Sequence, residues 1–424
     1  MFKGRDFMVQ LLAANLTGAN GAGIAVAGGG ALPLVDLSEP NFAARLDASF
    51  RDTGFVAVSG FKEEEIFPLR DAVYRDWKDF VSFPPSLKKK YHTDPTGQRG
   101  FTPDGAESKN LFTELRAHMM IARSLPVGHP LLVCRPLFYA PNVEVAEVTT
   151  LVSNTEKLLG ALERLALQLF ESVEVYLDLP FGTIASTLVR GEMLMRLHHY
   201  PKAEVVASRV LDGVHTVYGA DVNGVEVVDV KMRDGSTKEN VLRAGPHSDT
   251  GHCTILLGTE VAGLCVQKRD GAALRFTTRP GTIAFQVADF LEHIVSGWHS
   301  SIHWVSLTEE SAKADRYSMA DFLHQRPTAK AGPFINGALL FHRLWEIGYI
   351  NDQEGRPDMA LRDTLINQVN ALPPDAVLIP QILIWENWAL SQGLIAKPEL
   401  GRYYHLHNRK TGVYLRRPEP EEEI

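Results

Sequence analysis

Residues 244–257 read AGPHSDTGHCTILL, and the interpretation of the chain starts from His247-Ser248-Asp249 at their centre. Residues two apart in a β-strand point to the same side, so this imidazole and this carboxylate can converge on one ion. A third ligand would have to come from a distant segment, and His303 lies in such a segment, Ile302-His303-Trp304-Val305. Two histidines and one carboxylate leave coordination positions open, as in non-haem Fe(II) oxygenases. A lone His-x-Asp is common without a metal, so the hypothesis needs support from other residues of the chain.

A second pair of polar residues, Arg316 and Ser318, begins thirteen residues after His303. They are again two apart, so both can lie on one face of a strand. A planar guanidinium binds a carboxylate through two parallel hydrogen bonds, and a neighbouring hydroxyl adds a third. The pair therefore indicates a site for a co-substrate with a free carboxylate.

Taken together, His-x-Asp, the later histidine and Arg-x-Ser resemble the isopenicillin N synthase-like branch of the 2-oxoglutarate- and Fe(II)-dependent oxygenases. Residues 195–201 (MRLHHYP) are similar to the family's strand ending in Tyr-Tyr-Pro, and residues 288–303 to the segment that leads to its distal histidine. Residues 32–37 (LPLVDL) and 53–58 (TGFVAV) are similar to its opening strands. The resemblance covers residues 31–330.

The resemblance implies that His247, Asp249 and His303 are the catalytic metal ligands and hold Fe(II). It also implies that 2-oxoglutarate binds the iron through its 1-carboxylate and 2-keto oxygens, while its far carboxylate reaches Arg316 and Ser318 and Tyr200 adds a hydrogen bond. The expected reaction consumes O2, releases succinate and CO2, and hydroxylates, desaturates or cyclises a small-molecule substrate. Ascorbate is a candidate reductant.

Pocket residues are proposed from their expected position near the mouth of the β-barrel that this family forms. The candidates for substrate contact are Phe101, His198, Phe285, His324 and Gln325. None of them reveals which molecule is bound, and amino-acid derivatives, peptides and secondary metabolites all stay open.

The chain departs from the family pattern in three places. Trp304 stands where the family often has arginine after the distal histidine, and His198 stands where asparagine is common. The connection from Tyr200 to His247 spans 47 residues, and its alternation and Asn-Gly and Asp-Gly pairs predict an added β-hairpin. Because this insert, residues 203–240, joins two strands that line the site, we expect it to cap the mouth of the pocket.

Alternatives stay open at this point. His299 is the main rival of His303, and Asp289 of Asp249. Arg316 and Ser318 could bind a substrate carboxylate in an oxidase of the same fold that does not use 2-oxoglutarate. A jelly-roll protein that keeps the metal site without turnover is the remaining possibility.

The fold class expected is α+β with a mainly β core, a double-stranded β-helix or jelly-roll, because short strands with frequent turn signals fill residues 252–323. We expect a mobile leader over 1–30 and an N-terminal α/β region over 31–143. Residues 144–330 should hold a long supporting helix and the catalytic core. C-terminal helices and an acidic tail are expected over 331–424.

Composition bounds the partners and the compartment. The chain is 45% hydrophobic and 22% charged with a formal net charge of −8, which disfavours nucleic acid as a partner. It has no apolar run of about 18 residues, so a membrane span is not expected. Three cysteines without metal-type spacing fit a reducing, cytoplasmic setting. The oligomeric state cannot be read from the sequence.

Overall fold

The structure is a computed structural model that describes most of residues 27–331. The described ranges are 27–92, 99–105, 112–125, 141–189, 191–215, 221–232, 234–249, 251–258, 263–268, 271–277, 281–325, 330–331, 334–335, 376–377 and 407–408. The predicted C-terminal helices and acidic tail therefore lie outside the described residues, apart from short strand segments. The predicted leader runs into a strand, β1 (Ala27–Ala31), which pairs in parallel with β16.

The larger of the two main sheets has eight strands in the order β2-β3-β17-β14-β19-β7-β6-β4. All neighbouring pairs are antiparallel except β2 and β3. Its strands are β2 (Leu34–Asp36), β3 (Phe55–Ser59), β4 (Gly100–Thr102), β6 (Ala117–Ala122), β7 (Met193–Tyr200), β14 (Cys253–Leu257), β17 (Ile283–Val287) and β19 (Arg316–Leu323).

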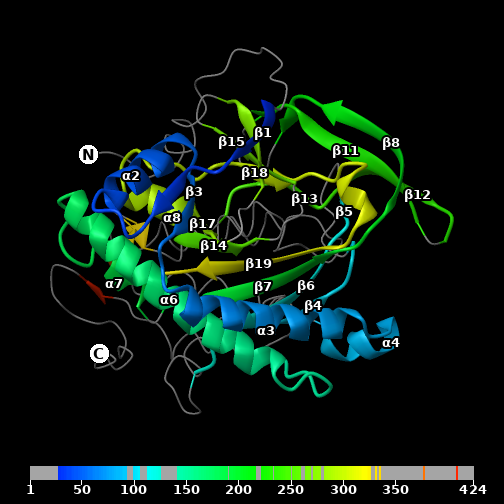
Figure 1. The fold of residues 1–424 in the computed structure, drawn as a ribbon, viewed down its shortest axis with the longest axis horizontal. Helices are drawn as coiled ribbons and strands as arrows, with labels where there is room; N and C mark the ends of the chain where they lie inside the picture. The colour runs from blue at the N-terminus through cyan, green and yellow to red at the C-terminus, as the bar shows by residue number, and fades with distance from the viewer. Residues whose placement is uncertain are drawn as a thin grey trace.

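The smaller sheet has the order β1-β16-β15-β18-β13 and lies beside the larger one (Figure 1). Its further strands are β13 (Ala244–His247), β15 (Leu264–Gln267), β16 (Ala273–Thr277) and β18 (His303–Val305). Phe55 and Ala284 of the larger sheet share an apolar cluster with Val266 and Phe276 of the smaller one. From β13 to β19 the chain passes repeatedly between the two sheets, and this is the predicted double-stranded β-helix. Every strand predicted between 252 and 323 is present.

Three helices pack on the outer face of the larger sheet: α2 (Phe42–Asp52), α3 (Glu63–Val81) and α6 (Leu151–Tyr176). The long supporting helix predicted within residues 144–330 is α6, and its apolar stripe, which includes Leu158 and Leu162, is buried. Burying each such leucine stabilises the fold by roughly 1.5–3 kcal/mol. The short helical segments are α4 (Pro85–Lys88), η1 (Lys89–Tyr91), α7 (Ala185–Leu188), α8 (Asp289–Ile294) and η2 (Ser311–Lys313).

The insert forms a separate sheet in the order β5-β12-β11-β8. Its long antiparallel pair joins β8 (Glu204–Leu211) to β11 (Val225–Lys231), so an added hairpin is present as predicted. The other strands are β5 (Thr113–Glu114) and β12 (Thr237–Leu242), with β9 (Val214–His215) and β10 (Asp221–Val222) pairing separately.

One set of apolar contacts joins the insert to the smaller sheet. Val225 and Val227 of β11 share a buried cluster with Cys265 of β15 and Trp304 of β18. That the insert caps the pocket mouth stays a prediction. These contacts place Trp304 of β18 against the insert, while its neighbour His303 belongs to the cluster of metal-ligand candidates. They also give a physical reason for tryptophan at position 304: a large apolar side chain fills the space between the two sheets.

Two smaller findings concern membranes and thiols. Among the described helices, none is long and apolar enough to cross a bilayer. Cys253 and Cys265 are free and buried, and burial raises the pKa of both thiols. Both therefore act as small apolar side chains at neutral pH.

Candidate metal centre and co-substrate site

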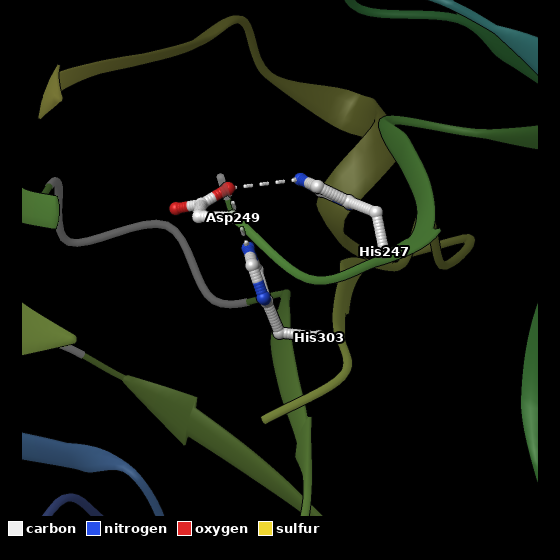
Figure 2. A group of neighbouring side chains, drawn as sticks. All are labelled: His247, Asp249 and His303. Carbon is white, nitrogen blue, oxygen red and sulfur yellow. Dashed lines mark ion pairs between the residues drawn. The ribbon is translucent and has the colours of Figure 1, made fainter. Parts of the chain in front are cut away.

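Three potential ligands meet where β13 and β18 pair. His247 is the last residue of β13 and His303 the first of β18, and the two are direct partners in the antiparallel register. Asp249 comes after β13 has ended, so the two-residue spacing acts through a turn and not through the continuous strand that the sequence suggested. Figure 2 shows the three side chains converging. Their ligand atoms all lie within 4.8 Å of one another.

The distances leave these groups available to a metal ion. Asp249 Oδ1 lies 3.6 Å from His247 Nε2 and 3.8 Å from His303 Nε2, and the two imidazole centroids are 4.3 Å apart. Both nitrogen–oxygen distances are longer than a hydrogen bond. The three ligand atoms thus do not satisfy one another.

The other polar atom of each ligand is already engaged. His247 Nδ1 lies 2.7 Å from the Gly245 carbonyl, and His303 Nδ1 lies 3.2 Å from the Ser301 carbonyl. In the tautomer that carries its hydrogen on Nδ1, each imidazole donates to its carbonyl and turns the Nε2 lone pair toward the ion. Thr254 Oγ1 donates to Asp249 Oδ2 at 2.5 Å, which leaves Oδ1 for the metal.

The charge state and the donor set fit a divalent transition-metal ion. Burial and the neighbouring His303 lower the pKa of His247 to about 3, so its imidazole is neutral, the form that binds metal. Two imidazoles and one carboxylate with open positions suit Fe(II) and match no structural zinc site of four protein ligands.

Of the two rival metal ligands, His299 and Asp289, the structure describes the surroundings of His299 only. Within the described residues, the one cluster of this kind contains His303 and not His299. The backbone N–H of His299 instead donates to the Phe50 carbonyl at the end of α2. The side chain of Asp289 lies outside the described residues.

The predicted carboxylate site forms across β19 and β7. Arg316 is the cross-strand partner of Tyr200, and Ser318 is the partner of His198. Arg316 Nη1 donates to Ser318 Oγ at 3.1 Å, and the guanidinium carbon lies 4.9 Å from the centre of the Tyr200 ring. All three residues predicted to bind the co-substrate are thus together and buried.

A second arginine, which was not predicted, lies near Tyr200. Arg243, immediately before β13, is fully buried, and its guanidinium carbon is 5.9 Å from the Tyr200 ring centre. An arginine within the apolar run of residues 241–245 was the only signal for it in the sequence.

Of the predicted substrate contacts, His198 and His324 lie near these groups. The His198 ring is 5.5 Å from that of Tyr200 and nearly parallel to it. It also lies 5.9 Å from His118, its cross-strand partner on β6, which sequence reasoning missed. His324 lies against Gly251, two residues after Asp249. A Cβ added to Gly251 would be 3.0 Å from the imidazole of His324. Gln325, next in the chain, is buried.

Phe101 and Phe285 lie elsewhere than predicted. Both belong to the large core between the eight-stranded sheet and its helices. The Phe101 ring packs 5.2 Å from that of Phe80 on α3. Strand alternation explains the error for Phe285, because it is its neighbour Gln286 that reaches the metal cluster, with Nε2 3.1 Å from His303 Nδ1. Neither phenylalanine is a pocket wall.

Two family models match the chain. Residues 191–325 match the "2OG-Fe(II) oxygenase superfamily", and residues 32–144 match the "non-haem dioxygenase in morphine synthesis N-terminal" region. The first of these contains all three metal-ligand candidates together with Arg243, Arg316 and Ser318.

Curated relatives are distant. A "Bi-functional coumaroyl CoA and feruloyl CoA ortho-hydroxylase" of Ruta graveolens is 28% identical over 162 residues, which are 35% of this chain and 42% of that protein. A Dictyostelium discoideum protein named "Probable iron/ascorbate oxidoreductase" is 23% identical over 301 residues, 68% of this chain and 76% of that protein. The chain thus spans less than half the length of the plant hydroxylase.

Solved structures share the fold. A 2OG-Fe(II) oxygenase family protein of Caulobacter crescentus has a TM-score of 0.57 at 24% identity, covering 80% of this chain and 99% of that one. A Neurospora crassa protein solved in complex with alpha-KG and thymine has a TM-score of 0.54 at 20% identity, covering 78% of this chain and 94% of that one. At these identities the likeness concerns the fold alone.

Proposed function

Because the chain belongs to the 2OG-Fe(II) oxygenase superfamily, we propose that it is a non-haem Fe(II)- and 2-oxoglutarate-dependent oxygenase that oxidises a small organic molecule and releases succinate and CO2. The observation that carries the proposal is the cluster of His247, Asp249 and His303, each with its second polar atom already bound. A metal site used only for binding would not need Arg316 and Ser318 buried beside Tyr200.

The residues take distinct roles in this proposal. His247 Nε2, His303 Nε2 and Asp249 Oδ1 hold the iron, which supplies the oxidising chemistry when it is bound together with 2-oxoglutarate and O2. Arg316 and Ser318 bind the far carboxylate of 2-oxoglutarate, and the Tyr200 hydroxyl adds a hydrogen bond to it. Because Arg316, Ser318 and Tyr200 are buried, water is excluded and the charge-assisted hydrogen bonds to the carboxylate are stronger.

The substrate is proposed only as a class. His118 and His198 lie on adjacent strands at the co-substrate end, so a small molecule with hydrogen-bonding groups suits them. The relatives named as ortho-hydroxylases support hydroxylation as the first outcome to test, ahead of desaturation and cyclisation. The relative named as an iron/ascorbate oxidoreductase supports ascorbate as the reductant.

The test is an anaerobic titration of the purified protein with Fe(II) and then 2-oxoglutarate, monitored through the visible metal-to-ligand charge-transfer band. We expect a band with the wild type and none with His303→Ala, because one ligand is lost. His299→Ala is the matched control and should keep the band. Arg316→Ala should weaken 2-oxoglutarate binding roughly tenfold to a hundredfold, since it removes charge-assisted hydrogen bonds.

Each result has a distinct meaning. Iron binding without a band would contradict 2-oxoglutarate dependence and favour an oxidase in which Arg316 binds a substrate carboxylate. A band without succinate release in air, across a panel of small molecules, would favour a binding protein. Loss of the band in His299→Ala but not in His303→Ala would refute the ligand assignment.

A further inference from the structure

Arg243 has more hydrogen-bond donors than partners. Its Nη2 donates to the carbonyls of Ser311 at 2.7 Å and Ala314 at 3.2 Å, in the segment that precedes β19. Its Nε and Nη1 are buried and have no hydrogen-bond partner among the described residues. Leaving the donors of a charged group buried and unpaired is costly, so an arginine kept here indicates a missing anionic partner.

No carboxylate of the described residues pairs with Arg243. The acidic side chain whose charge reaches it is that of Asp315, which is 42% exposed. Asp315 already accepts a hydrogen bond from the Lys202 backbone and lies 3.4 Å from His199. Burial and the nearby Arg316 lower the pKa of Arg243 to about 10, so its guanidinium is charged at neutral pH.

The two cations border the same aromatic ring. Arg243 and Arg316 place their guanidinium carbons 5.9 Å and 4.9 Å from the centre of the Tyr200 ring. Two buried cations this close to one side chain repel each other, and an anion between them relieves the repulsion. The far carboxylate of 2-oxoglutarate is an anion of the right kind at this end.

We propose that Arg243 is a second cationic residue for the far carboxylate of 2-oxoglutarate, acting with Arg316 and donating from Nη1. This inference rests on the proposed function. It predicts that the enzyme selects a dicarboxylic over a monocarboxylic oxo acid through two residues, Arg316 at the start of β19 and Arg243 immediately before β13. The competing explanation is that Arg243 only holds the segment of Ser311 and Ala314 against β13.

The experiment compares two oxo acids on the anaerobic Fe(II)-loaded protein. 2-Oxoglutarate and 2-oxopentanoate have the same five-carbon chain, but only the first has a far carboxylate, and both are titrated by the charge-transfer band. Arg243→Met should weaken 2-oxoglutarate binding roughly tenfold to a hundredfold and change that of 2-oxopentanoate by less than about threefold. Arg243→Lys, which keeps a cation with fewer donors, should fall between wild type and Arg243→Met. Arg209→Met, on the insert, is the control for losing a positive charge elsewhere.

The outcomes separate the explanations. Equal weakening of both oxo acids by Arg243→Met would mean a structural role and overturn the inference, as would unchanged 2-oxoglutarate binding. Should Arg243→Met not fold, the same selective loss is expected, to a smaller extent, in Arg243→Lys, and its absence there would overturn the inference. A wild-type protein that binds iron but neither oxo acid would refute this inference and the proposed function together.

Discussion

Replacing Thr254 by valine removes one hydroxyl from the metal centre and conserves side-chain volume. Thr254 lies on β14, is 1% exposed, and donates to Asp249 Oδ2 at 2.5 Å. Hydrogen bonds to charged groups contribute about 1.5–3 kcal/mol, which corresponds to roughly a tenfold to hundredfold change in a binding constant. Losing a hydrogen-bond partner of a metal ligand typically costs about 10- to 100-fold in metal affinity, the same range. We therefore expect Thr254→Val to bind Fe(II) more weakly by that factor.

The assay is anaerobic competition for Fe(II) between the protein and a chromophoric chelator. Thr254→Ser keeps the hydroxyl and should stay near wild type. Thr155→Val is the matched control, because it also removes a fully buried threonine hydroxyl, but one that donates to the Leu151 carbonyl within α6. The reasoning is refuted if folded Thr254→Val binds Fe(II) within about twofold of wild type, or if Thr155→Val loses as much affinity.

Two further predictions concern stability. Trp304→Ala should lower the free energy of unfolding by about 3–5 kcal/mol, because it leaves a cavity between the insert and the smaller sheet. Urea denaturation measures this loss, and a value below about 1 kcal/mol would mean that the insert does not pack against Trp304. Burial and the neighbouring His324 lower the pKa of His252 from 6.5 to about 3, so between these values the unfolded chain binds more protons and stability is lost as pH falls. The contribution is fully present above pH 6.5 and falls below it by about 1.4 kcal/mol per pH unit, so His252→Phe should flatten the stability profile measured by urea denaturation from about pH 7.5 to 5. An unchanged pH profile in His252→Phe would contradict this.

Residue types and spacing, together with the resemblance to a known family, predicted that the three ligand candidates lie together. The resemblance to a known family favoured His303 over its rival His299, and β13 and β18 pair so that His247 and His303 are direct partners. Arg316 and Ser318 could be predicted from the two-residue alternation on β19, whereas Tyr200 on β7 followed from the resemblance to a known family. The strands and α6 could be predicted because their apolar periodicity is long and regular.

The rest depended on contacts between distant segments. Phe285 was assigned to the pocket from its expected position near the barrel mouth, but which side of β17 faces the interior is fixed by pairing with β3 and β14. Arg243 is a single charge in an apolar run, and only its approach to Tyr200 and Arg316 gives it a role. The location of the insert likewise could not be predicted from its own alternation, which indicates an apolar face but not the surface that this face covers.

The strand β18 has a consequence for how folding and metal binding are linked. Its first residue, His303, faces the candidate iron site, and its second, Trp304, packs against β11 of the insert. An ion that restrains His303 also restrains the tryptophan behind it and, through Val225 and Val227, the hydrogen-bonded ladder of the insert. Local opening of the insert and release of the ion are therefore thermodynamically coupled. Amide hydrogen exchange along β11 should therefore slow when the metal binds.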